Sequence, residues 1–274
     1  MTRRLPAKER FPRSAVMGVL NVTPDSFSDG GVHLQPAAAL AEAWHMLDVG
    51  AAIVDVGGES TRPGSQPVPV EKELERVIPV VQGLIGAPVS VDTAKAEVAR
   101  RGLELGAEMV NDVTALRGDP AMAEVVAEFD AYVVLMHMQG EPRTMQDNPN
   151  YDDVVSDVCR FLEERVAFAL AAGIAEDRIF VDPGFGFGKT LEHNVELLRR
   201  LEEICRLGLP VLVGLSRKSS LARLLGDPRG LVATLAASLA AAAAAYERGA
   251  WMVRAHDVRE HVEALRVAAA VVNA

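Results

Sequence analysis

The stretch VLVGLSRKSS, residues 211–220, is the most informative part of the chain. A short run of apolar and β-branched residues ends at a glycine, and a cationic turn containing Lys218 follows at once. Such a run is typical of a buried strand. The same change from an apolar run to a polar cluster recurs at residues 15–31, 51–64, 87–95, 108–113 and 178–189. Because polar groups that follow parallel strands gather on one rim of a barrel, the sequence predicts a single site at that rim.

Strand-length runs alternate with helix-like stretches along the whole chain, with no second compositional regime and no linker. Strands are predicted at residues 15–20, 53–56, 89–91, 109–111, 132–136, 179–181, 211–214 and 251–254. Helices are predicted at residues 36–49, 70–84, 95–105, 120–128, 151–172, 191–207, 219–246 with a break near 227–230, and 257–272. A glycine follows several of these helices, as is common at helix ends: Gly50, Gly106, Gly173, Gly208 and Gly249.

This alternation predicts an α/β protein with one domain over residues 1–274, a (β/α)8 TIM barrel in which residues 1–14 form an N-terminal extension. An open doubly wound sheet is the alternative. No GxGxxG follows the first predicted strand to support it.

Composition limits the classes of function. The chain has 274 residues, 49% of them hydrophobic, and a net charge of −10, which argues against a nucleic-acid surface. The alanine-rich run 231–245 is uncharged but shorter than the ~20 residues of a membrane span. Cys159 and Cys205 lack metal-ligand spacing and are interpreted as reduced thiols. We therefore expect a cytoplasmic protein that binds neither nucleic acid nor membrane.

Two kinds of polar group are predicted at the rim. Asp92, Asn111 and Asp182 follow three different strands, and such acceptors suit a ligand with a donor-rich edge, such as a guanidine-like heterocycle. Any one of them taken alone is equally explained by capping of a loop. The cations expected at the same rim suit a di-anion such as pyrophosphate, and they are Arg62, Arg217, Lys218, Arg254 and His256.

Other chemistry has little support in the sequence. There is no GxSxG elbow, no HExxH and no His/Cys cluster with metal-ligand spacing. Asn21 could contribute a carbonyl oxygen to a Mg²⁺ held mostly by a ligand phosphate and water. The sequence therefore indicates a site that binds two molecules and stabilises a leaving group, without a covalent step on the enzyme.

Several motifs together resemble one family. They are NVTPDSFSDGG, DVGGESTRPG, VDT, NDV, LMHMQGEPRTMQDNPNYDDVV, DPGFGFGK, GLSRKSS and VRAHDV, in this order. In these motifs, spread over about residues 15–272, the chain resembles the dihydropteroate synthases. The resemblance implies a (β/α)8 barrel, usually a homodimer, in folate biosynthesis. The implied reaction is a transferase reaction that joins 4-aminobenzoate to (7,8-dihydropterin-6-yl)methyl diphosphate and releases diphosphate with Mg²⁺.

The resemblance also implies roles for single residues in the two substrate pockets. Asp92, Asn111 and Asp182 look like the groups that bond the nitrogens of the pterin ring, with Asp182 accepting from its donor edge. Lys218 would bond the pterin carbonyl and flank the 4-aminobenzoate site. The other implied pocket residues are Thr61, Pro63, Val113, Met136, Phe187, Gly214 and Ser219.

On the phosphate side, the resemblance implies that Asn21, Arg62, Arg254 and His256 hold the diphosphate, with Asn21 also on Mg²⁺. The implied residues of the first mobile loop, which closes over the reacting carbon, are Asp25, Phe27 and Asp29. If the C–O bond breaks first, donors at the diphosphate stabilise the departing anion, which is usually a large catalytic effect. The implied route is therefore SN1-like.

The chain departs from many relatives at Leu215 and Ala222, where a small alanine and a glycine are usual. No insertion in the 182–189 or 214–220 loops would exclude a sulfonamide, so the site is expected to be sulfonamide-sensitive. Two alternatives remain: a pterin-binding methyltransferase that serves a corrinoid protein, and a degenerate homologue with an accessory role. The SRK turn and the RxH pair argue against the first, and the retention of Asn21, Arg62 and Lys218 argues against the second.

Overall fold

The computed structural model describes residues 4–23, 35–60, 65–141, 143–227 and 232–272. Its strands are β1 (Ala15–Asn21), β2 (Ile53–Gly57), β3 (Val89–Asp92), β4 (Met109–Asp112), β5 (Tyr132–Met136), β6 (Ile179–Asp182), β7 (Leu212–Val213) and β8 (Met252–Ala255). All neighbours pair in parallel, in the order β6-β5-β4-β3-β2-β1-β8-β7. A single bridge between Val181 and Val211 brings the two ends of the sheet together.

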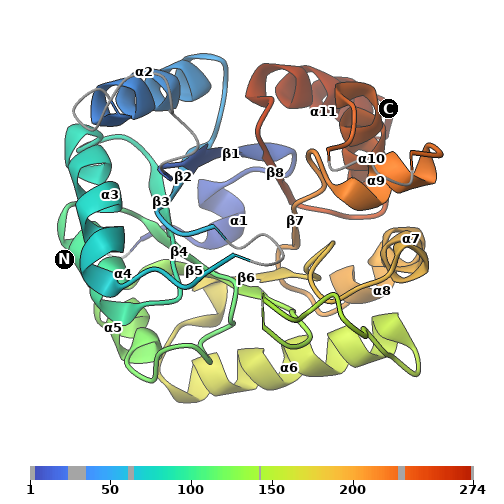
Figure 1. Cartoon of the computed structure of the whole chain (residues 1–274), viewed down its shortest axis with the longest axis horizontal. Helices are drawn as coiled ribbons and strands as arrows, with labels where there is room; N and C mark the ends of the chain where they lie inside the picture. Colours follow the sequence, from blue (N-terminus) through green and yellow to red (C-terminus); the bar gives the residue numbers. More distant parts are fainter. Residues whose placement is uncertain (1–3, 24–34, 61–64, 142, 228–231, 273–274) are drawn as a thin grey trace.

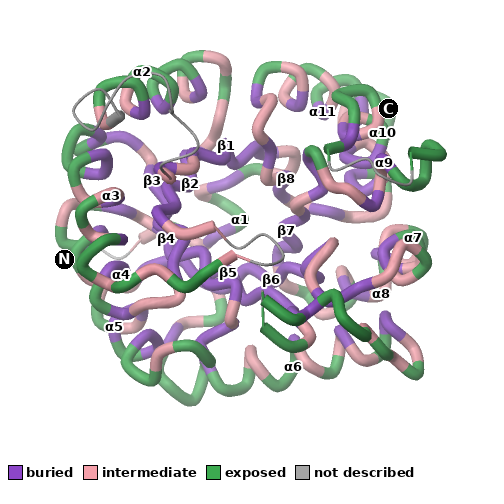
Figure 2. The backbone as a smooth tube through the Cα atoms, viewed as in Figure 1, coloured by how far each residue is buried: buried purple, intermediate pink, exposed green. Residues whose placement is uncertain are grey.

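Helices surround these strands in a ring (Figure 1). They are α2 (Gln35–Asp48), α3 (Val70–Gly83), α4 (Ala96–Glu104), α5 (Met122–Glu128), α6 (Val154–Ala171), α7 (Leu191–Arg199), α8 (Leu201–Cys205), α9 (Ser219–Leu224), α10 (Leu235–Glu247) and α11 (Val258–Val272). The strands are buried and the outer turns of the helices are exposed (Figure 2). The predicted (β/α)8 TIM barrel is confirmed, and the open doubly wound sheet is excluded.

Periodic burial explains why these helices pack against the barrel. In α4, Val98, Ala99, Gly102 and Leu103 are buried and recur at the spacing of one helix face. Gly102 allows the closest approach, because a Cβ there would lie 2.6 Å from Cγ2 of Val91 on β3. The glycines predicted to end helices all have positive φ: Gly50, Gly106, Gly173, Gly208 and Gly249.

The N-terminal segment closes one end of the barrel, which was not predicted. It contains α1 (Ala7–Arg10), seen inside the ring of helices in Figure 1. Phe11 is fully buried, and its ring centroid lies 5.3 Å from that of Tyr132 and 5.9 Å from that of Phe180. Tyr132 and Phe180 lie near the starts of β5 and β6. The segment therefore covers the amino-terminal end of the strands, and their carboxyl ends lie at the other end of the barrel.

Two predicted helices have different bounds from those expected. The single helix over residues 191–207 is wrong, because the backbone leaves the helical region at Arg200 (φ −108°, ψ 23°) between α7 and α8. The Arg200 guanidinium lies 2.6 Å from Asp153, the N-cap of α6, and so ties the break to a neighbouring helix. The break in the helix over 219–246 is longer than expected, since α9 ends at Leu224 and α10 begins after its Thr234 cap. In the part of the chain that the structure describes, no helix is both long and apolar enough to cross a membrane.

Candidate active site

The residues predicted at the rim lie at one end of the barrel. Asn21 ends β1, Asp92 ends β3, and Asp182 ends β6. The strand register pairs Asn21 with Gly57, Gly57 with Asp92, and Asp92 with Asn111. Lys218 follows β7 and His256 follows β8, so both residues lie at this same end of the barrel. The parallel sheet thus brings residues from six strands to one mouth.

Arg254 lies between two buried acids at this mouth. Its Nε donates to Asp55 Oδ2 at 2.7 Å, and its Nη2 donates to Asp92 Oδ2 at 2.7 Å. Asn111 Nδ2 donates to the same Asp55 oxygen at 2.8 Å, which leaves the side-chain amide oxygen Oδ1 of Asn111 as an acceptor for a ligand. Burial raises the pKa of Asp92 to about 7, and Arg254 opposes that shift. Two of the five donors of Arg254 therefore bond to described residues, and the other three have no partner among the residues that the structure describes.

Asp55 was missed in the sequence because it lies inside an apolar run and looks like part of a strand. It is fully buried on β2, and its Oδ1 has no hydrogen-bond partner among the described residues. A charged residue in such a run was the signal that could have found it, since a buried carboxylate needs a partner. Its partner, Arg254, follows 199 residues later in the chain.

Asp182 lies at the start of a loop whose backbone is held at many points. Its Oδ1 accepts from the Gly184 amide at 2.7 Å. Burial raises the pKa of Asp182 to about 6, while that hydrogen bond and the charges of Lys218 and Lys189 oppose the shift. Gly184 has φ 68°, and a Cβ there would lie 1.9 Å from the carbonyl oxygen of His137, so only glycine fits.

Lys189, the last residue of the DPGFGFGK motif, also holds this loop in place. It was not predicted from the sequence as a site residue. Its buried Nζ donates to the carbonyls of Gly184 and Phe187, both at 3.0 Å, and lies 2.9 Å from His137 Nδ1. Burial lowers the pKa of Lys189 to about 7. Tyr151 Oη donates to the Gly188 carbonyl at 2.7 Å. These contacts fix the position of Phe187 at the mouth.

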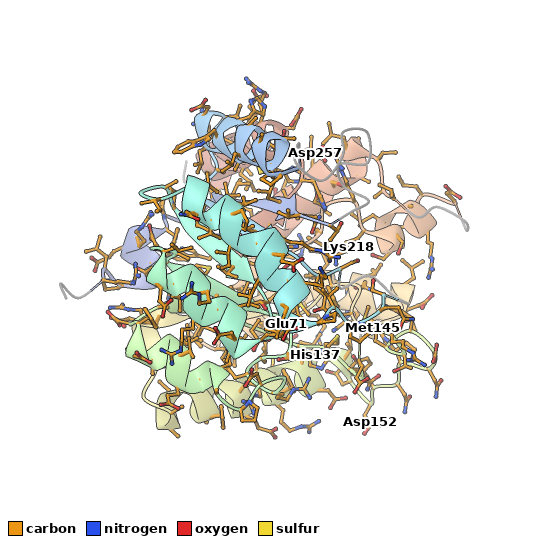
Figure 3. All side chains as sticks on the ribbon, turned by 60° about the vertical axis from the view of Figure 1, so that its left-hand side comes forward. Glu71, His137, Met145, Asp152, Lys218 and Asp257 are labelled. Atoms are coloured by element: carbon orange, nitrogen blue, oxygen red, sulfur yellow. The ribbon has the colours of Figure 1, made fainter. Side chains whose placement is uncertain are left out.

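An apolar wall lies beside these polar groups. Val113, Met136, Met138 and Met145 form a buried cluster, and Phe187 packs against it. Val113, Met136 and Phe187 were expected as pocket residues, whereas Met138 and Met145 were not. Lys218 Nζ lies 4.4 Å from the centroid of the Phe187 ring, a cation–π contact. In Figure 3, Lys218 and Met145 lie on the same side of the molecule.

The SRK turn places the side chains of Arg217 and Lys218 in different surroundings. Arg217 has φ 59°, an uncommon value for a residue other than glycine, and its amide donates to Ser238 Oγ at 3.0 Å. The Arg217 side chain is 47% exposed and pairs with Asp257, so this expected rim cation is already engaged. Burial lowers the pKa of Lys218 to about 8, while Asp182 raises it. Lys218 thus faces the acid at the start of the neighbouring loop.

The remaining expected residues are placed as follows. Ser219 begins α9, and a Cβ on Gly214 would meet nothing within 4 Å, so the space beside it is open. Leu215 is buried and lines a cavity of about 230 Å³ together with residues of α7, α9 and α10, while Ala222 is buried on α9. Some expected residues lie outside the described part of the chain: Asp25, Phe27, Asp29, Thr61, Arg62 and Pro63.

The described residues of the barrel mouth offer few ligands for a metal ion. No group of three or more His, Cys, Asp or Glu side chains in the described ranges could hold an ion. Asn21, partly buried at the end of β1, offers one neutral carbonyl oxygen at the mouth. Such a site fits Mg²⁺ bound through one protein oxygen, with phosphate and water as its other ligands.

A barrel mouth with buried acceptors, an apolar wall and paired cations is the arrangement expected of a small-molecule site. The family model for pterin binding enzymes matches residues 17–256. The chain therefore belongs to the pterin binding enzyme family.

Its relatives within that family are dihydropteroate synthases. The enzyme of Escherichia coli K12 is 50% identical over 262 residues, which are 94% of this chain and 92% of that protein. The structure of the Xanthomonas albilineans dihydropteroate synthase with 4-aminobenzoic acid is 49% identical, with a TM-score of 0.88 over 99% of this chain and 98% of that one. The Yersinia pestis dihydropteroate synthase in complex with a sulfonamide drug is 46% identical, with a TM-score of 0.89 over 96% and 95% of the two chains.

Proposed function

We infer that the protein catalyses the dihydropteroate synthase reaction of folate biosynthesis. As a transferase, it condenses (7,8-dihydropterin-6-yl)methyl diphosphate with 4-aminobenzoate to give 7,8-dihydropteroate and diphosphate. The observation that carries this inference is the set of buried acceptors Asp92, Asn111 and Asp182 at one mouth. Relatives that align with nearly the whole length of this chain are named dihydropteroate synthases, which also supports the inference.

The acceptors suit the pterin ring. Its 2-amino and ring N–H groups form a donor edge, which a carboxylate accepts in a charge-assisted pair. The Gly184 amide takes one acceptor site on Asp182 Oδ1, which leaves acceptor sites on both carboxylate oxygens for this edge. Asn111, oriented by Asp55, offers its carbonyl oxygen, and Lys218 supplies a donor for the pterin carbonyl. The methionine-rich wall with Phe187 would cover the flat face of the ring.

The donors at the other side of the mouth suit the diphosphate. Three donors of Arg254 have no partner among the described residues, and His256 follows Arg254 two residues later. We propose that Asn21 contributes an oxygen to a Mg²⁺ bound with the substrate, and the bound ion supplies positive charge that neutralises the phosphates. Arg62 is assigned to the same anion by the resemblance alone.

The proposed route is SN1-like. An aromatic amine is uncharged at neutral pH, so no base has to activate it, but it is a weak nucleophile. The bond between the pterin methylene and the diphosphate oxygen breaks first, and its electron pair leaves with diphosphate. The amine lone pair then forms the C–N bond, and the resulting ammonium group loses its proton to the released diphosphate or to solvent. Arg254 and His256 stabilise the anion as its charge develops, which is where fixed donors contribute most to the rate.

Binding of 4-aminobenzoate is expected to depend on diphosphate. We propose that bound diphosphate with Mg²⁺ completes the second pocket, so 4-aminobenzoate alone meets an incomplete site. In calorimetry, it should bind well with pyrophosphate and Mg²⁺ present and weakly without them. Equal affinity for 4-aminobenzoate in both conditions would remove this coupling from the account.

Sulfonamides are expected to inhibit competitively with 4-aminobenzoate. They copy its aniline and its para-acid geometry, and a site excludes a close mimic only by a specific repulsive element. Gly214 leaves space beside the SRK turn, and Leu215 lines a separate cavity. Steady-state assays at fixed pterin diphosphate test this, with sulfamethoxazole raising the apparent KM for 4-aminobenzoate. Activity that is unaffected far above the 4-aminobenzoate concentration would show a reshaped pocket.

We also propose that the protein works as a homodimer in the cytoplasm. Leu224 and Leu225, at the end of α9, are 58% and 63% exposed, and adjacent apolar side chains of this kind support a protein contact. The mass in solution, measured by light scattering, tests the dimer.

A further inference from the structure

Ser216 makes two contacts with one histidine of the anion site. Its Oγ accepts from the His256 backbone N–H at 3.2 Å and lies 3.1 Å from His256 Nδ1. Ser216 is 6% exposed, so water does not readily replace either contact. The serine comes from the SRK turn after β7 and the histidine from the end of β8, 40 residues apart.

The hydrogens available on Ser216 Oγ and on His256 determine which group donates in each contact. A serine hydroxyl has one hydrogen and two lone pairs, and the backbone N–H can only donate to it. If Nδ1 also carried a proton, the hydroxyl hydrogen would have no acceptor among the described residues. A buried hydrogen-bonding group left unsatisfied destabilises the arrangement that contains it. The favoured arrangement has the hydroxyl donating to an unprotonated Nδ1.

We propose that Ser216 is a positioning residue that holds His256 as the neutral tautomer with its proton on Nε2, so that Nε2–H donates to the departing diphosphate. The proposal rests on the proposed function, because it needs the diphosphate beside His256. It assigns to the SRK turn a task separate from that of Lys218, namely setting the proton position on a residue of the next strand.

The surrounding charges also keep His256 neutral. Burial, followed by Arg254, Arg217 and Lys218, lowers the pKa of His256 to about 3, and Asp257 opposes the shift only in part. Asp257 is the carboxylate next in sequence, but Arg217 occupies both of its oxygens, at 3.1 and 2.5 Å. It is therefore committed to another partner and leaves Nδ1 to Ser216.

The neutral donor has a chemical consequence. Charge grows on the leaving oxygen only as the C–O bond breaks, so a donor fixed beforehand interacts more strongly with the departing anion than with the bound ester. Ser216 prevents the alternative tautomer, in which Nε2 would present a lone pair to a phosphate and repel it.

Nitrogen NMR of histidine-labelled protein tests the proton position directly. The chain has six histidines, and the signals missing from the His256→Gln variant assign His256. At pH 7 the wild type should show an unprotonated Nδ1 and a protonated Nε2. A proton on Nδ1 of His256, or an imidazolium with both nitrogens protonated, would overturn the proposal, and the proton position is measured on the wild-type protein itself.

A matched pair of serine variants tests the consequence for binding. Ser216→Ala should weaken pyrophosphate binding about 3- to 10-fold, the loss of about one hydrogen bond, and should shift the Nδ1 signal. Ser238→Ala removes the other hydroxyl that holds this turn, through the Arg217 amide, and should leave both the Nδ1 signal and the pyrophosphate affinity nearly unchanged. Equal effects of the two variants would mean that Ser216 acts only by holding the turn.

Replacing the histidine separates this inference from the proposed function. In His256→Gln an amide nitrogen takes the place of Nε2, so pyrophosphate should bind more tightly than to His256→Asn. Adding Ser216→Ala to His256→Gln should then weaken pyrophosphate binding no further, since no tautomer is left to set. Wild-type protein that binds no pyrophosphate with Mg²⁺ would overturn both the anion site and this inference. Tight pyrophosphate binding with a protonated Nδ1 would overturn this inference alone.

Discussion

Replacement of Asp182 with alanine is expected to abolish binding of the pterin diphosphate. The variant removes the carboxylate that we propose as the acceptor for the donor edge of the ring, and two charge-assisted hydrogen bonds contribute about 1.5–3 kcal/mol each. The affinity for the pterin should therefore fall by about 100-fold or more in calorimetry. An analogue that lacks the 2-amino group should bind wild type weakly, but it should lose little further affinity in the variant.

A neighbouring acid provides the control. Asp112 is equally buried, at the end of β4, but its carboxylate accepts from the amides of Thr114 and Leu116 within the protein. Asp112→Asn should lower stability and leave the pterin affinity of the folded protein close to that of wild type. If the analogue loses affinity equally in wild type and in Asp182→Ala, then Asp182 is not the partner of the 2-amino group.

Replacement of Arg254 with methionine is expected to be the most destabilising single change at the mouth. It leaves Asp55 and Asp92 buried without their shared counter-charge, and breaking a buried ion pair in this way costs about 3–5 kcal/mol. Without Arg254, the folded-state pKa of Asp92 rises further above its unfolded value. The variant should therefore be most stable at low pH and lose stability as the pH rises through that raised pKa.

Arg217→Met is the matched control for this experiment, because it breaks an exposed pair with Asp257 two residues after β8. Exposed pairs contribute about 0–1 kcal/mol. Urea unfolding of the two variants at several pH values compares them, and Asp92→Asn in the Arg254→Met background should recover part of the loss. A similar, small effect of both arginine variants would contradict the buried acid–arginine cluster.

The barrel could be predicted because each of its strands has a recognisable local sequence pattern. A buried parallel strand is a short apolar run, and the polar residue at its end, such as Asp92 or Asp182, marks the rim directly. Val211 shows the limit of this signal, because only a single bridge closes the barrel there, in place of the longer strand expected. The helix break at Arg200 was not predictable either, since Arg200 pairs with Asp153 at the start of another helix, a contact that no local pattern reveals.

Within the candidate site, the roles that could not be predicted are those of residues whose partners lie far away in the sequence. Asp55 reads as an ordinary strand residue until Arg254 is placed beside it. Lys189 ends a glycine-rich motif, but its contact with His137 exists only because β5 brings His137 next to the loop after β6. Ser216 belongs to the GLSRKSS motif, in which Lys218 is the more conspicuous residue. Its partner His256 follows another strand. Local pattern identifies the residues, and tertiary contact determines their roles.

The most direct test of the account is product formation by the purified protein. With pterin diphosphate, 4-aminobenzoate and Mg²⁺, we expect diphosphate and 7,8-dihydropteroate to appear in equal amounts, and chelation of Mg²⁺ to slow both. Asp182→Ala should remove both products together. Diphosphate release that proceeds at the same rate without 4-aminobenzoate, or the absence of dihydropteroate when both substrates are present, would contradict the proposed function.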